Sequence, residues 1–90
     1  MITIQKDLGG KFAIRAEAVL ALQHLQLVFA IREYPIVSSY LSAHSLELEV
    51  FFNNKMPQLP NGYKASRSVV QSYDSDDGRI RVKTFYFDFL

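Results

Sequence analysis

Residues 18–31 read AVLALQHLQLVFAI, and this stretch decides what kind of fold the chain can adopt. Alanine, leucine and glutamine dominate it, and these residue types favour the helical state. Pro35 follows closely and disfavours a helical backbone at Tyr34, the residue before it. The sequence therefore predicts one long helix over residues 17–33.

The apolar side chains of this helix fall on two opposite flanks when its residues are placed at steps of about 100°. The first stripe consists of Ala18, Leu22, Leu25 and Phe29. The second stripe consists of Leu20, Leu27 and Ile31, with His24 beside it. A surface helix of a small domain usually has one such stripe. We therefore expect both flanks to be covered, the first by a sheet and the second by another copy of the chain, so that the candidate protein interface consists of Leu20, Leu27, Ile31 and His24.

The segments before this helix have the period of two that is typical of strands. In residues 1–5 the isoleucines alternate with polar neighbours, in residues 11–16 Phe12, Ile14 and Ala16 alternate with Lys11, Ala13 and Arg15, and the pair Gly9-Gly10 separates the two segments. Paired glycines suit a tight turn because they adopt positive φ without steric cost. The sequence thus predicts an N-terminal β-hairpin.

The segments after the helix give less uniform signals. Residues 36–44 carry apolar side chains at helical spacing, which predicts a short second helix, although the serines among them weaken helix propensity. Residues 46–52 alternate and favour a strand, with a helix that continues through residue 52 as the rival prediction. Residues 53–64 hold two prolines and little periodicity, so we expect a loop.

The C-terminal third predicts a second β-hairpin. Residues 66–73 and 79–90 are rich in strand-forming residues, and the Asp-Gly pair between them is a strong hairpin signal. The second of these strands changes its apolar face near Lys83 and Thr84. Either a bulge lies there, or the two ends of the strand pack against different partners.

Together these elements predict a single α+β domain over residues 1–90. Its antiparallel sheet consists of the N-terminal hairpin and three C-terminal strands, and it packs on one long core helix and a short second helix. Ninety residues are enough for one hydrophobic core.

The composition argues against several classes of function. The chain has no cysteine, so we expect no disulfide and no thiolate chemistry, which suits the cytoplasm. Its net charge is +1, far from the strong positive charge of many nucleic-acid-binding proteins. The longest apolar stretch, residues 18–31, is shorter than the roughly 20 residues of a membrane-spanning helix. We expect a soluble protein with no membrane partner.

No motif in the sequence indicates catalysis, a metal or a cofactor. His24 and His44 are the two histidines, and they lack the spacing of a zinc site. The acidic turn at residues 74–77 does not match a calcium-binding loop, because the following residues do not supply its glycine and its final acid at the required positions. No glycine-rich phosphate loop occurs. We therefore expect no enzyme, no bound cofactor and no metal.

A mild concentration of positive charge marks the C-terminal hairpin. Basic strands with interleaved aromatic residues can hold single-stranded nucleic acid. The predicted order of helices followed by three antiparallel strands is also similar, in architecture, to the small ribosome-dependent RNA-cleaving toxins of toxin–antitoxin pairs. That resemblance implies functional roles for Arg67, Arg79, Arg81 and Tyr86. The full set of candidate nucleic-acid-binding residues is Lys64, Arg67, Arg79, Arg81, Lys83 and Tyr86.

The leading functional hypothesis is a non-enzymatic protein–protein interaction domain of the accessory or inhibitor type. It acts as a homodimer and binds a further protein. The hypothesis depends on the missing catalytic motifs and on the second apolar stripe of the helix. An RNA- or DNA-binding module is the alternative, and a small-ligand pocket between helix and sheet is a third possibility.

Overall fold

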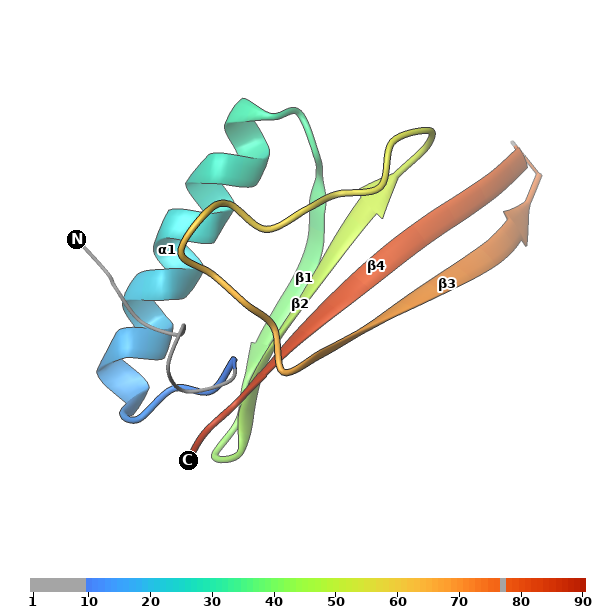
Figure 1. The fold of residues 1–90 in the computed structure, drawn as a ribbon. Helices are drawn as coiled ribbons and strands as arrows, with labels where there is room; N and C mark the ends of the chain where they lie inside the picture. The colour runs from blue at the N-terminus through green and yellow to red at the C-terminus, as the bar shows by residue number, and fades with distance from the viewer. Residues whose placement is uncertain (1–9, 77) are drawn as a thin grey trace.

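The computed structural model describes residues 10–76 and 78–90. One helix packs on one face of a four-stranded antiparallel sheet with strand order β1-β2-β4-β3 (Figure 1). The predicted class, an α+β fold with an antiparallel sheet on a long helix, is confirmed. In chain order the elements are α1 (Arg15–Ile31), β1 (Ile36–Leu41), β2 (Ser45–Phe52), β3 (Arg67–Ser75) and β4 (Gly78–Asp88).

Helix α1 ends two residues before the predicted boundary, in a Schellman turn. The N–H of Tyr34 donates to the carbonyl of Phe29 (2.8 Å), and the N–H of Glu33 donates to that of Ala30 (3.1 Å). Glu33 adopts φ 65°, the left-handed conformation that such a turn requires. The ring of Tyr34 meets the ring of Phe29 edge-on, with centroids 6.1 Å apart. This contact fixes the direction in which the chain leaves the helix.

The predicted short helix over residues 36–44 is wrong, because residues 36–41 form strand β1. Tyr40 and Leu41 pair with Glu47 and Leu46 of β2, so Leu41 reaches the core and Tyr40 points away from it. Ser42 then makes the turn, and its hydroxyl oxygen accepts two backbone N–H groups of the next three residues, each at 3.0 Å. The apolar residues of this segment fit both periods, and pairing with β2 decided between them.

The strand predicted over residues 46–52 is confirmed as β2, and the rival helix is not formed. Its burial alternates strictly, with Leu46, Leu48, Val50 and Phe52 facing α1. The C-terminal hairpin is also confirmed, with β3 and β4 in continuous register. The interior of the protein therefore lies between alternate residues of the central strands and one flank of α1.

The predicted N-terminal hairpin is partly outside the described residues, since residues 1–9 are not among them. Its second strand, expected over residues 11–16, is wrong because α1 already begins at Arg15. Of the described residues before α1, only Phe12 joins the sheet, through an isolated parallel bridge to Phe89. The Phe12 N–H donates to the carbonyl of Asp88 (2.8 Å), and the Leu90 N–H donates to that of Phe12 (3.0 Å). Helix propensity from residue 15 onward outweighed the short alternation.

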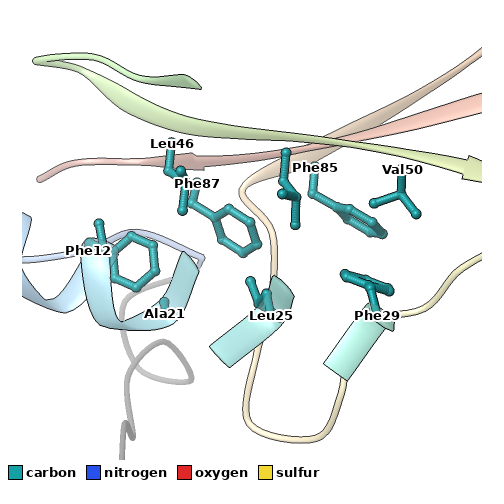
Figure 2. Packing of buried hydrophobic residues seen from close by; sticks show 10 residues of the cluster. Phe12, Ala21, Leu25, Phe29, Leu46, Val50, Phe85 and Phe87 are labelled. Carbon is teal, nitrogen blue, oxygen red and sulfur yellow. The ribbon is translucent and has the colours of Figure 1, made fainter. Parts of the chain in front are cut away.

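Phenylalanine and aliphatic side chains together fill the core, as Figure 2 shows. The first predicted stripe of α1 faces the sheet, and Leu25 and Phe29 are fully buried against Phe85 and Phe87 of β4. The rings of Phe29 and Phe85 stack with centroids 6.0 Å apart. Phe12 closes the other end of the core against Phe87. These contacts are the main reason why α1 lies along β2 and β4.

The change of face along β4 occurs without a bulge. Lys83 pairs with Val50 and Thr84 pairs with Glu49 in an unbroken register. Phe85 faces α1, whereas Val82 lies on the opposite face of the sheet, where its neighbours on β2 and β3 bury it. The second of the two predicted explanations is therefore correct, and the two ends of β4 pack on different faces.

Candidate interaction surfaces

The second apolar stripe of α1 lies on the side of the helix that faces away from the sheet. Leu20, Leu27 and Ile31, which we call the outer flank, are 52%, 59% and 73% exposed. In a single chain the outer flank is therefore uncovered, as far as the described residues go, and its cover by another copy of the chain stays a prediction. In the described part of the chain no second layer of structure packs on the opposite side of α1, so this side faces solvent.

His24 borders the outer flank and contacts the loop between β2 and β3. Its Nδ1 and the hydroxyl of Tyr63 form a 2.8 Å hydrogen bond, and the two rings stack with centroids 5.5 Å apart. Burial raises the pKa of the Tyr63 phenol above its ordinary value. Leu20, His24, Leu27 and Ile31 follow one another at intervals of four, three and four residues, the spacing of a helix-to-helix seam. Through this contact with His24, the loop borders the row of side chains on one side.

The same loop is fastened to the C-terminal end of α1. The guanidinium of Arg32 donates to the carbonyl of Gln58 (2.8 Å), and the hydroxyl of Tyr34 donates to that of Lys55 (3.1 Å). Beside these contacts lies an open hollow of about 520 Å³, with Asn53 and Ile80 in its wall. The polar side chains of Arg32 and Tyr34 in its wall already hold the loop in place, which argues that this hollow has a structural role.

The candidate nucleic-acid-binding residues do not form one patch. Arg67 and Tyr86 lie directly opposite each other on the sheet face away from α1, with the guanidinium carbon 4.1 Å from the ring centroid. Arg79, Arg81 and Lys83 alternate on the other face of the sheet. Arg79 contacts Asp74 (3.4 Å), Arg81 lies over the ring of Phe52 (5.9 Å), and Lys64 precedes β3 in the loop.

Lys83 lies inside the protein, facing the loop between β2 and β3. Its side chain is only 8% exposed, and its ammonium donates to the carbonyl of Pro57 (3.2 Å). The ammonium also lies 4.9 Å from the centroid of the Phe85 ring. Burial lowers the pKa of Lys83 below its ordinary value. A phosphate in solvent has no access to this charge.

The sheet face away from α1, which we call the open face, carries two carboxylates that sequence reasoning did not single out. Glu47 and Glu49 lie on β2 opposite Tyr86 and Thr84 of β4, and the hydroxyl of Ser38 donates to Glu49. They line a shallow hollow of about 220 Å³. The alternation of glutamates with apolar residues in the sequence of β2 was the signal from which this pair of carboxylates could have been predicted. Their negative charge opposes binding of a nucleic-acid backbone across this face.

The described residues contain no cluster of three or more metal-ligating side chains. Within the same part of the chain, no helix combines the length and apolar character needed to cross a membrane. Comparisons with models of protein families, with curated proteins and with solved structures found no match to this chain. Inference about function therefore depends on the surfaces described above.

Proposed function

We propose that this chain is a non-enzymatic protein-interaction domain of the accessory or inhibitor type, which acts as a homodimer and binds a further protein. The observation that carries the proposal is the outer flank of α1, where Leu20, Leu27 and Ile31 are each more than half exposed. Contiguous exposed apolar side chains mark interaction sites because their contact with water is unfavourable.

The spacing of the outer flank supports a helix as the group that covers it. Residues four and three apart line one side of a helix, and a second helix with a similar stripe can pack side chains between them. Another copy of α1 offers such a stripe and would meet the first about a two-fold axis. An amphipathic helix of another protein offers the same chemistry.

The size of the outer flank sets a limit on what it can hold alone. Complete burial of a leucine or isoleucine contributes about 1.5–3 kcal/mol, so the exposed parts of these three side chains contribute roughly 3–5 kcal/mol per chain, or about 6–11 kcal/mol for a pair of helices. Association costs about 4–15 kcal/mol in lost translational and rotational freedom. A helix pair on this flank would therefore gain about as much as association costs, so the flank suits an amphipathic helix of a further protein as well as a second copy, and a stable homodimer needs another interface.

Two measurements test the proposal. Light scattering at high micromolar concentration should give a mass of about twice the 10.3 kDa of one chain, and a monomer would exclude the homodimer. In a pull-down from the cells that produce the protein, Leu27→Glu should lose a specific partner. The matched control Gln26→Glu changes an exposed residue outside the outer flank and should retain that partner.

The geometry gives less support to the RNA- or DNA-binding alternative. Five of the six candidate residues are divided between the two faces of the sheet, Lys64 lies in the loop before β3, and Lys83 is buried. A filter-binding assay at low salt separates the two functions, because backbone contacts are strongest there. We expect no retention of RNA or DNA. Retention that weakens with salt and is lost in Arg67→Ala would favour the alternative.

A further inference from the structure

Strand β3 is an edge strand that the rest of the described chain leaves uncovered. Its neighbour in the sheet is β4, and its other edge faces solvent. All of its side chains from residue 67 to 74 are exposed, among them Val69 (42%), Val70 (41%) and Tyr73 (50%). Figure 1 shows the β3–β4 hairpin reaching away from the body of the protein, beyond the cover of α1. Apolar side chains on both faces of this strand are therefore in contact with water.

The two edges of the sheet differ in how well they are protected against pairing with another strand. At the β1 edge the strand is six residues long, follows Pro35 and has a register shift between Ile36 and Ser38. Prolines, short strands and irregular registers all hinder pairing at an edge. At the β3 edge the strand has nine residues and pairs with β4 without interruption. The sheet is thus open to extension at β3.

The sequence of β3 favours pairing as well. Its centre, residues 68–73, reads SVVQSY, without charge, proline or glycine. Uncharged segments of this length with high strand propensity pair readily with other strands. The charged residues of the strand, Arg67 and Asp74, lie near its ends. Lysine or another charge at the centre of an edge strand is the usual protection, and β3 lacks it.

We propose that β3 pairs antiparallel with β3 of a second copy of this chain, about a two-fold axis at Val70, and joins the two sheets into one of eight strands. The proposal rests on the homodimer of the proposed function and gives that homodimer its interface. The outer flank of α1 then remains available for the further protein. Backbone hydrogen bonds across the new strand pair supply the contact that the outer flank lacks.

Symmetry restricts the register of this pairing. A two-fold axis perpendicular to the sheet keeps each face continuous, so residues that lie opposite each other across the interface must share a face. An axis at Val70 places that residue against its own copy and Arg67 opposite Tyr73 of the second copy. The guanidinium of Arg67, already over the ring of Tyr86, would then lie between two aromatic rings on the open face. An axis at Gln71 would bring two amide side chains together instead.

Cysteine substitution tests both the interface and its register, because the chain has no cysteine of its own. Residues opposite each other in an antiparallel pair have Cα atoms about 4.5–5.5 Å apart, within reach of a disulfide. Under mild oxidation, Val70→Cys should form a covalent dimer. Gln71→Cys is the register control and Leu27→Cys is the control for the outer flank, and we expect neither to form a covalent dimer.

A charge at the centre of β3 tests the same interface without a crosslink. Val70→Lys places two ammonium groups at the two-fold axis, and light scattering should show the mass falling twofold to that of one chain. Val70→Thr keeps the branched side chain and should remain dimeric. Circular dichroism checks that both variants are folded, which we expect because residue 70 is exposed.

The outcomes separate this inference from the proposed function. A dimer that crosslinks through Val70→Cys and dissociates in Val70→Lys supports pairing through β3. A dimer that crosslinks through Leu27→Cys, through Gln71→Cys or at none of the three positions overturns the inference while the homodimer stands. A wild-type chain that is monomeric at high micromolar concentration overturns both.

Discussion

The ammonium of Lys83 donates a 3.2 Å hydrogen bond to the carbonyl of Pro57 inside the protein. It connects the central strand β4 to the long loop between β2 and β3. Pro57 belongs to this loop, and its side chain is fully buried. A buried ammonium is therefore part of the structure that holds this loop on the sheet.

Replacing this lysine should destabilise the fold. Lys83→Met keeps an apolar stem of similar length but leaves the carbonyl of Pro57 without its donor, and we expect the free energy of unfolding to fall by about 1–2 kcal/mol at pH 7. Urea denaturation measures the change. Arg79→Met, which removes an exposed cation of the same strand, should change it by less than about 0.5 kcal/mol. Equal effects of the two substitutions would contradict this role for Lys83.

The free energy of unfolding should also depend on pH in the alkaline range, because the pKa of Lys83 differs between the folded and the unfolded chain. Burial lowers the pKa of Lys83 below its ordinary value of 10.5, so between the two values the unfolded chain binds more protons than the folded one. The free energy of unfolding therefore rises with pH in this window, by linkage. Lys83→Met should lack the rise. Urea denaturation of both chains from pH 7 to 10 measures it, and parallel curves would disprove the assignment.

Ionisation of Tyr63 should change the free energy of unfolding in the opposite direction at higher pH. Burial raises the pKa of its phenol above the ordinary value of 10.0, so above pH 10 the unfolded chain loses this proton before the folded one. The free energy of unfolding then falls as the pH rises. Tyr63→Phe should weaken this fall, and absorbance titration of the folded wild type should show one tyrosine that ionises late. Identical alkaline unfolding of the two chains would speak against a buried phenol.

The left-handed residue after α1 offers a stabilising substitution. Glu33 has φ 65°, which costs about 1 kcal/mol for a residue with a Cβ and little for glycine. Glu33→Gly should therefore raise the free energy of unfolding by about 0.5–1 kcal/mol, visible as a melting temperature several degrees higher. Gln26→Gly, within α1, should lower it by about 1 kcal/mol. A destabilised Glu33→Gly would mean that the glutamate makes a compensating contact.

Two glycines provide a matched test of close packing. Gly10 and Gly62 both have positive φ, 87° and 95°, but a Cβ at Gly10 would lie 2.5 Å from backbone atoms of Ala65 and Ser66. Nothing lies within 4 Å of a Cβ at Gly62. Gly62→Ala should cost about 1 kcal/mol for its conformation alone, and Gly10→Ala at least about 2 kcal/mol more. Thermal denaturation compares them, and equal losses would refute the close approach.

Local sequence patterns determined α1 and the β3–β4 hairpin, whereas for β2 they only favoured a strand over the rival helix. Residues 18–31 have a strong helical composition over several turns, and the Asp-Gly turn joins two strand-forming segments without help from distant residues. The face that α1 turns to the sheet also followed from the spacing of its apolar residues. Each of these signals is repeated several times within one element, so no tertiary contact was needed to decide it.

The tertiary structure alone decided β1, the position of Phe12 and the burial of Lys83. Residues 36–41 fit two periods, and only the partner strand β2 made the extended form the better one. Lys83 and Arg81 both alternate with apolar neighbours, but the loop covers one and leaves the other in solvent. A period in the sequence gives the direction in which a side chain points. What covers it depends on residues far away in the chain, because burial is a property of the folded whole.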